Sequence, residues 1–380
     1  MATIAAVAAV ALLVSGCTGG EPRVVQSSSQ SASTDPGSPG PNSAEPEATP
    51  SASSAPELPE GTPGTPQQLA GGLDTPWGVA FLPDGSALIT LRDEARVIQL
   101  TDDGDVVEID ASGPDGVVPD VAVGGEGGLL GIAVSQSFSS DSLVYLYRTG
   151  EDGSNVFTMR LGEARLSDPT VILDGIEAAS THNGGRLAFG PDGSLYVSTG
   201  DAQNRPNAQN NNSLNGKILR IAADGSIPDD NPFEGSPVFS FGHRNVQGMG
   251  WDSEGNMWAS EFGQDRLDEL NLIEAGGNYG WPEVEGDGGG SGFIDPLVTW
   301  PPGQASPSGL AVTQDAVYLA ALRGERLWRV PRSGTTVRKP EAYFQNEHGR
   351  LRAVAVAPDN SLWLLTNQGP ESRVLRVPLD

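Results

Sequence analysis

The chain has 380 residues, of which 50 are glycine and 30 are proline, and its formal net charge is −27. So acidic a surface repels nucleic acid and anionic lipid headgroups, and neither is expected as a partner. Frequent glycine and proline are typical of many short strands joined by tight turns. No stretch beyond the N-terminus keeps the apolar period of a long helix. The acidity serves solubility, but it also leaves carboxylates available for hard cations such as calcium.

The first 17 residues predict a lipoprotein signal peptide. An apolar run over residues 4–14, too short to span a bilayer, leads into Val14-Ser15-Gly16-Cys17. Small residues before a cysteine form the bacterial lipobox, whose cysteine is lipidated and becomes the new N-terminus. Lipidation of Cys17, the only cysteine, would anchor the protein to the outer face of the cell membrane. No Lys or Arg precedes the run, a departure that leaves the true start codon open.

Residues 18–66 are expected to be a disordered tether. They consist of Ser, Pro, Gly, Thr, Ala and Glu with almost no large apolar side chain. Such a segment cannot bury enough surface to offset the entropy lost on ordering. The globular domain therefore covers residues 67–380.

An internal repeat predicts the fold of this domain. A strand of small apolar residues, a turn resembling Pro-Asp-Gly and a strand of alternating large residues recur at residues 77–90, 131–147, 185–199, 248–261, 309–321 and 352–366. Each copy precedes an outer strand that ends in a basic–aliphatic step, at residues 95–100, 155–161, 216–221, 268–273, 325–330 and 372–377. The spacing, roughly 45 to 60 residues, is the length of a four-stranded propeller blade. The sequence predicts an all-β protein, a six-bladed β-propeller.

A single blade has two apolar faces and can bury them only against neighbouring blades in a ring. The ring must also close, and the segment 67–73 is the candidate that pairs with the last blade. Ligands of propellers bind where the loops of all blades converge, so polar residues just before the inner strands are the candidates for a site.

Basic residues occupy matching places in successive blades. His182 lies in a glycine-rich loop before an inner strand, and His243 takes the same position in the next blade. Arg323, Arg350 and Arg352 follow in later blades. Cations that face one channel repel each other unless an anion lies between them. This pattern predicts a ligand with several carboxylates, held by bidentate contacts.

A further group of polar residues spans 261–269 and 277–282. Acidic side chains and free carbonyls in glycine-rich loops supply the oxygen ligands that calcium requires. An acidic surface loop explains the same spacing equally well, so both interpretations stay open at this point.

Five segments resemble the PQQ-dependent sugar dehydrogenases, the glucose/sorbosone or soluble aldose dehydrogenase family. They are residues 126–131, 181–201, 214–232, 242–248 and 268–282. The resemblance implies a six-bladed propeller that holds pyrroloquinoline quinone (PQQ), a tricarboxylate ortho-quinone, over the channel. It also implies an enzyme that oxidises the anomeric or alcohol carbon of a sugar by hydride transfer to PQQ.

The resemblance assigns roles residue by residue. His182 matches the catalytic base, Arg244 the arginine beside the quinone carbonyl, and Asp201 closes the catalytic segment. The matches to cofactor contacts are Glu126, Asn245, Arg323, Arg350 and Arg352, with Arg244 shared between both sets. The carbonyls of Gly263 and Gln264 match ligands of an active-site calcium, Glu269 and Tyr279 match a second, structural calcium site, and Trp300 matches an aromatic wall of the substrate pocket.

Departures from the soluble glucose enzyme leave the sugar open. Thr181 replaces an acidic residue that contacts substrate, the loop after Asp201 lacks the glutamine that the glucose enzyme has at its far end, and the segment 300–307 is shorter. The electron acceptor and the oligomeric state are also open.

Two other functions fit a propeller. A calcium-dependent hydrolase of the lactonase type needs a central metal held by carboxylates and Asn, whereas these loops deliver mainly Arg and His. A surface module that binds carbohydrate without turnover would retain the scaffold and tolerate the departures on the substrate side.

Overall fold

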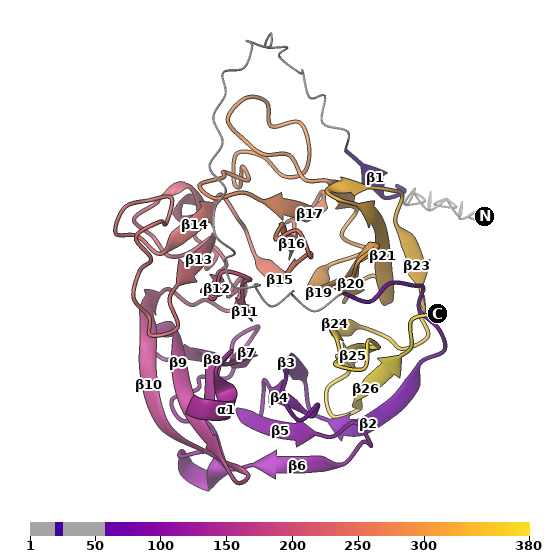
Figure 1. The fold of residues 1–380 in the computed structure, drawn as a ribbon. Coiled ribbons are helices and arrows are strands. Elements are labelled where there is room, and N and C mark those ends of the chain that lie inside the picture. Colours follow the sequence, from indigo (N-terminus) through magenta and orange to yellow (C-terminus); the bar gives the residue numbers. More distant parts are fainter. Residues whose placement is uncertain (1–19, 26–57) are drawn as a thin grey trace, which may run out of the picture.

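The computed structural model describes residues 20–25 and 58–380, and in them six antiparallel sheets stand around a central axis (Figure 1). The predicted six-bladed β-propeller is confirmed. Helix is limited to the short α1 (Phe138–Asp141) and the 3-10 turns η1 (Pro114–Gly116) and η2 (Arg205–Gln209) in the described residues. None of the helices in this part of the chain is long and apolar enough to cross a membrane.

The first three blades follow one another along the chain. Blade 1 is β3 (Pro76–Phe81), β4 (Ala87–Leu91), β5 (Arg96–Leu100) and β6 (Val106–Ile109). Blade 2 is β7 (Leu129–Val134), β8 (Leu143–Gly150), β9 (Gly153–Gly162) and β10 (Arg165–Ile176). Blade 3 is β11 (Leu187–Phe189), β12 (Leu195–Ser198), β13 (Lys217–Ile221) and β14 (Val238–Phe241).

The last three blades include strands from outside the repeat. Blade 4 is β15 (Val246–Trp251), β16 (Met257–Glu261), β17 (Asp268–Ile273), β18 (Val298–Trp300) and, at its edge, β1 (Arg23–Val24). Blade 5 is β19 (Pro307–Val312), β20 (Ala316–Ala321), β21 (Arg326–Ser333), β22 (Thr336–Val337) and β23 (Glu341–Tyr343). Blade 6 is β24 (Leu351–Val356), β25 (Leu362–Thr366), β26 (Ser372–Val377) and β2 (Gln67–Leu73).

The ring closes as expected from the sequence. β2 pairs antiparallel with β26, with Gln68 opposite Leu375 and Leu73 opposite Ser372. The first strand of the domain is thus the outermost strand of the last blade, and closure joins the two ends of the chain's globular part.

Part of the predicted tether is docked on the propeller. Residues 20–25 add β1 to the edge of β18, and Thr62 exchanges backbone hydrogen bonds of 3.0 and 2.9 Å with Asp380. The prediction of a disordered linker over 18–66 is therefore wrong for residues 20–25 and 58–66, because sheet edges pair with short segments of almost any composition. Residues 1–19, with Cys17, and 26–57 lie outside the described residues.

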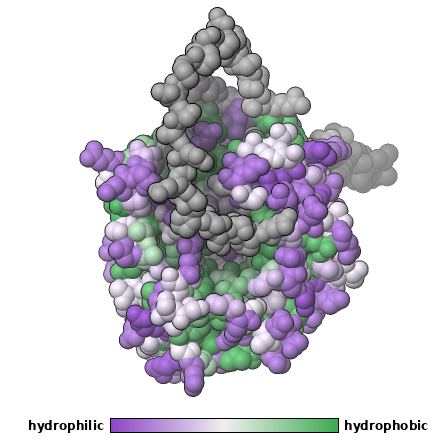
Figure 2. Space-filling model, viewed as in Figure 1, coloured by the Kyte–Doolittle hydropathy of each residue, from purple (hydrophilic) through white to green (hydrophobic). Residues whose placement is uncertain are grey.

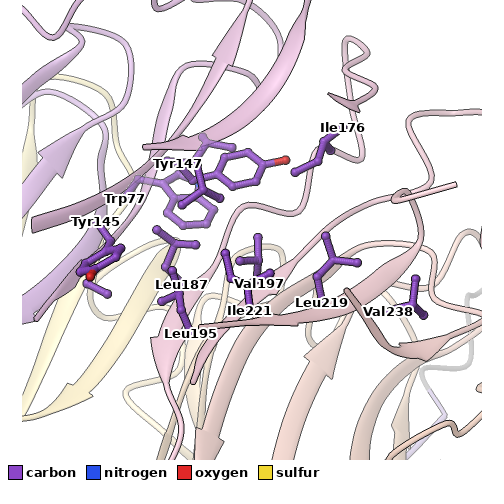
Figure 3. Close-up of a cluster of buried hydrophobic side chains, with 13 residues drawn as sticks. Trp77, Tyr145, Tyr147, Ile176, Leu187, Leu195, Val197, Leu219, Ile221 and Val238 are labelled. Atoms are coloured by element: carbon purple, nitrogen blue, oxygen red, sulfur yellow. The ribbon is translucent and has the colours of Figure 1, made fainter. Parts of the chain in front are cut away.

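The core lies between neighbouring blades. In one cluster, Tyr147 of β8 packs towards Leu187, Val197 and Leu219 of blade 3, and none of the four is more than 4% exposed (Figure 3). Alternating large side chains on both faces of each sheet produce this packing, as the blade repeat predicts. Hydrophilic residues cover much of the outer rim on the face in Figure 2.

Candidate active site

One end of the propeller gathers the loops that carry the predicted site. Residues that precede the inner strands and residues that follow the second strands line a single cavity of about 420 Å³. Before inner strands these are Glu126, His182, Arg244, Ser306 and Arg350, and after second strands Arg92, Phe262, Arg323 and Asn367. This volume is typical of a small-molecule site, for which about 300–1,000 Å³ is usual.

The cavity is cationic although the protein is acidic. Five arginines and His182 face two carboxylates, Glu126 and Asp268; the arginines are Arg92, Arg244, Arg323, Arg350 and Arg352. The structure thus brings together the cations that occupy matching places in the sequence. A larger cavity, about 810 Å³, lies over the turn between β8 and β9, but no predicted site residue lines it.

His182 is held by two carboxylates in a left-handed backbone conformation with a φ of 63°. Its N–H donates to Oε2 of Glu126 at 2.8 Å, and its Nδ1 lies 2.8 Å from Oδ1 of Asp201. The close approach requires Gly200, because a Cβ there would lie 1.9 Å from the His182 carbonyl oxygen. The ring is therefore fixed from behind, at the wall of the cavity.

Asp201 is fully buried and held from three sides. Its Oδ2 accepts a hydrogen bond from Nε1 of Trp281 at 2.8 Å, and Oδ1 accepts the Gln203 N–H at 2.8 Å. Burial alone would raise the pKa of Asp201, but the hydrogen bonds from His182 and Trp281 outweigh it, and the pKa lies below its usual value. An ionised Asp201 keeps the proton of neutral His182 on Nδ1, which leaves Nε2 as the basic nitrogen.

His243 does not face the channel, contrary to the expectation from its position. It is fully buried and stacks on Tyr279 at 4.7 Å. Its Nδ1 lies 2.9 Å from Oε2 of Glu261, whose other oxygen accepts the N–H groups of Arg244 and Asn245. The prediction that His243 faces the channel is therefore wrong, because Glu261 gives its ring a buried partner. Through Glu261, His243 supports the backbone of Arg244 and Asn245 instead.

Two cavity-lining residues have a buried donor without an acceptor in the described part of the chain: Nε of Arg244 and Nε of Arg352. Nη2 of Arg186 and Nδ2 of Asn245, whose residues lie outside the lining, are unpartnered in the same way. Burial lowers the pKa of Arg352 to about 9, and Arg92 beside it acts in the same direction. Unpaired buried donors are costly, so this donor set fits an anion with several carboxylates, such as PQQ.

The segment after β16 has its N–H groups engaged by carboxylates. Oε1 of Glu285 accepts the N–H groups of residues 264–267 at 2.7 to 3.2 Å. The N–H of Gly263 donates to Asp268 at 3.0 Å. With their N–H groups engaged and both residues in the cavity wall, Gly263 and Gln264 have carbonyls that fit calcium. Burial raises the pKa of Asp268 to about 7.

Glu269 and Tyr279 lie together behind the cavity wall, on a void of about 10 Å³. Burial and the neighbouring Glu261 raise the pKa of Glu269 to about 8. The Tyr279 hydroxyl donates to the Leu272 carbonyl at 2.6 Å, so it is not available to a metal. Within residues 20–25 and 58–380, no group of three or more His, Cys, Asp or Glu side chains is placed to hold a metal ion.

Trp300 does not line the pocket, so its assignment to an aromatic wall is wrong. Its side chain is 0% exposed in β18 and packs on Trp328, 6.0 Å away. β18 lies on the outer side of its blade, three strands from the channel, so its alternate residues face neighbouring blades. Pro302 and Ser306, which follow it, line the cavity instead.

Sequence reasoning missed Arg92, Asp268, Arg186 and Trp281. Arg92 directly follows the second strand of blade 1, and Asp201 and Arg323 follow the second strands of blades 3 and 5. The repeat of this position from blade to blade could have identified Arg92. Arg186 lies under Trp77, its guanidinium 4.2 Å from the ring centroid. No local signal marks Trp281, whose contact with Asp201 spans 80 residues.

Comparison with known proteins agrees with this geometry. The family model described as Glucose / Sorbosone dehydrogenase matches residues 73–376. The chain belongs to this family. The sugar dehydrogenase resemblance is thereby confirmed.

Proteins similar to this chain include named sugar dehydrogenases. The PQQ-bound structure of aldose sugar dehydrogenase from Streptomyces coelicolor is 44% identical, with a TM-score of 0.81, and covers 85% of this chain and 100% of that one. Aldose sugar dehydrogenase YliI of Escherichia coli is 31% identical over 334 residues, 78% of this chain and 88% of its own length. Quinoprotein glucose dehydrogenase B of Acinetobacter calcoaceticus is 31% identical over 255 residues, 58% of this chain and 53% of the relative.

Proposed function

We propose that this protein oxidises the anomeric or alcohol carbon of a sugar with PQQ as hydride acceptor and His182 as general base. The observation that carries the proposal is the pairing of His182 with an ionised Asp201 at the wall of a cavity rich in unpartnered arginine donors. A PQQ-bound relative that is 44% identical supports the choice of cofactor.

The cofactor would be held by the cations of the cavity. Arg323, Arg350 and Arg352, which line the cavity, would bind its carboxylates, and the unpartnered Nδ2 of Asn245 would donate to it. Glu126, which also holds the His182 backbone, completes this set. PQQ, when bound, supplies an ortho-quinone that accepts hydride from a carbinol carbon.

In this proposal the residues of the chain remove the hydroxyl proton of the sugar and stabilise the negative charge that develops. Nε2 of His182 takes the hydroxyl proton of the sugar, while Asp201 fixes the ring and stabilises the imidazolium that forms. Arg244, whose guanidinium also lies 5.6 Å from the Trp281 ring centroid, stabilises negative charge at the reacting oxygen.

Calcium belongs to the same proposal. The carbonyls of Gly263 and Gln264 would bind it in the cavity, and Glu269 with the Tyr279 carbonyl would form a second, structural site. Calorimetric titration of the apo protein with calcium, alone and with PQQ, tests this. Absence of any calcium binding would contradict it.

Reconstitution tests the proposed activity directly. The protein is incubated with PQQ and calcium, desalted, and assayed for dye reduction with a panel of aldoses. We expect retained quinone absorbance and activity with at least one sugar. Neither absorbance nor activity would refute the proposal; lactone hydrolysis without PQQ would favour a hydrolase, and glycan binding without PQQ a binding module.

The proposed location rests on the lipobox. Residues 1–17 would be the signal peptide, and Cys17 would carry the lipid on the outer face of the cell membrane. The mass of the mature N-terminal peptide tests this, with Cys17→Ser as the matched control. An unmodified Cys17 in membrane fractions would contradict it.

A further inference from the structure

The edge strand β1 docks the N-terminal segment on blade 4. Arg23 pairs with Thr299 and Val24 with Val298, and the Val25 N–H donates to the Leu297 carbonyl at 3.0 Å. Val24 also packs on the apolar cluster that blade 4 shares with blade 5. β1 therefore completes an otherwise open sheet edge at the outside of the ring (Figure 1).

Side chains hold the N-terminal end of this strand. Nη1 of Arg23 lies 2.9 Å from Oδ2 of Asp287, and Nζ of Lys339 in blade 5 lies 3.0 Å from Oε2 of Glu21. Gln304 donates to the Gly20 carbonyl. Exposed ion pairs contribute little by themselves, so the backbone pairing and the partial burial of Val24 provide most of the stabilisation of the docked strand.

The direction of β1 places its start at the cavity end of the propeller. β1 runs antiparallel to β18, and β18 leads directly into the segment that contains Pro302 and Ser306, which line the cavity. The position of Gly20 agrees, since a Cβ there would lie 3.6 Å from Pro301. The chain before Gly20 therefore leaves blade 4 beside the cavity.

Only three residue steps separate Gly20 from Cys17. Fully extended, they span at most about 11 Å. A free linker over 18–66 would instead let the propeller move on the order of 40 Å from its anchor. Docking of β1 removes that freedom, because the long segment 26–57 lies after the strand and not before it.

We propose that β1 is a docking strand that holds the cavity end of blade 4 against the lipid bilayer in which Cys17 is anchored. The inference rests on the proposed lipidation of Cys17. The partner is the bilayer surface itself, and the short connection determines the orientation. The net charge of −27 gives the protein no attraction to anionic headgroups. In this proposal the lipid anchor and the short connection hold the propeller at the bilayer, and no particular headgroup is needed.

Quenching by spin-labelled lipid headgroups tests the orientation. The full, lipidated chain is placed in vesicles of zwitterionic lipid, with one fluorophore at Gly303→Cys or at Glu254→Cys. Both positions are exposed, the first beside the cavity and the second in the β15–β16 turn at the other end of the same blade. Cys17 is the only native cysteine, and lipidation blocks its thiol. We expect several-fold stronger quenching at position 303; equal quenching would overturn the proposal.

A matched variant lengthens the connection without touching β1. Insertion of about 20 Gly and Ser residues between Thr18 and Gly20 adds a flexible coil, and quenching at position 303 should fall to the level at 254. Unchanged quenching after the insertion would also overturn the proposal, since the short connection would then not set the orientation.

Two measurements separate the possible failures. The mass of the mature protein reports lipidation, and a protein without lipid would refute both the anchor and the orientation. The pair Arg23→Cys and Thr299→Cys reports docking, because these residues are opposite each other and should form a disulfide under mild oxidation. A lipidated protein in which this disulfide fails to form would refute the docking strand and leave the anchor and the sugar oxidation standing.

Discussion

The chemistry of His182 depends on a residue that lies outside the cavity lining. Asp201 is fully buried and receives hydrogen bonds from His182, Gln203 and Trp281. These donors keep it ionised, and the ionised carboxylate keeps Nε2 of His182 free to accept a proton. The proposed base and its orienting carboxylate should therefore function as a unit, and mutation can separate their effects.

His182→Ala should abolish turnover and leave PQQ bound. Loss of a general base costs roughly 10²–10⁴-fold in rate, while the arginines proposed to bind the cofactor keep their places. Steady-state dye reduction and quinone absorbance after desalting measure the two effects. Normal turnover by the variant would show that another group removes the proton.

Asp201→Asn should lower kcat strongly and make the loss of folding stability at acid pH smaller. The pKa of Asp201 is below its usual value in the folded protein. Its carboxylate therefore stabilises the fold above the unfolded pKa of about 3.9, and this contribution is lost as the pH falls through the folded value. Denaturant midpoints between about pH 5 and pH 2, the range in which this contribution is lost, should show a shallower acid loss in the variant. Equal slopes for both proteins would contradict the assignment.

Much of this site follows from the sequence because the blades repeat. Matching positions in successive blades must converge, so His182, Arg323 and Arg350 could be predicted to meet. The burial of His243 and Trp300 could not be predicted, because it depends on partners supplied by other strands. Sequence register shows where a side chain begins, while the neighbouring elements decide what it contacts.

At the scale of elements, the loop between β12 and β13 is tied down by one buried cation. Nζ of Lys217 donates to the carbonyls of Asn207, Ala208 and Asn215 at 2.7, 3.1 and 2.8 Å. The same loop begins at Asp201, and Asn215 donates to the Gly200 carbonyl at 3.0 Å. The Lys217 side chain therefore fixes the segment that supports the pair of His182 and Asp201.

Lys217→Met should destabilise the protein and reduce kcat together. Three buried carbonyls lose their donor, at a cost of at least about 3 kcal/mol, and Asp201 loses part of its support. Denaturant unfolding and dye reduction measure the effects. Lys339→Met, which removes an exposed lysine, is the matched control and should change stability by less than about 0.5 kcal/mol. Equal effects of both substitutions would contradict the role of Lys217.

The blade repeat itself could be predicted because its turns are local. Asp84, Asp192 and Asp359 each accept the N–H two residues later at 3.0 to 3.1 Å, within the turn between the first two strands of three blades. Such contacts depend on sequence neighbours alone. The docking of β1 depends on the exposed edge of β18, about 275 residues away by the register of Arg23 with Thr299, and composition carries no sign of it.

At the scale of the whole molecule, the two N-terminal strands have different tasks. β2 closes the ring through β26, and its Ala70 and Leu73 are each 6% exposed. β1 adds two residues to the outside of a blade that already has four strands. Closure should therefore be essential to the fold, and β1 should be dispensable for it.

Two truncations separate these tasks. A chain that begins at Leu58 lacks β1 but keeps β2, and its free energy of unfolding should stay within about 1 kcal/mol of the full protein. A chain that begins at Asp74 also lacks β2; it leaves the edge of β26 open and exposes the apolar surface under Ala70 and Leu73, with a loss of at least about 3 kcal/mol. Denaturant unfolding of both chains measures the difference. Because the shorter chain has no partner strand for β26, it should also unfold in a broader transition and self-associate through that edge, which sedimentation detects. A chain from Asp74 as stable and monomeric as the chain from Leu58 would contradict closure by β2.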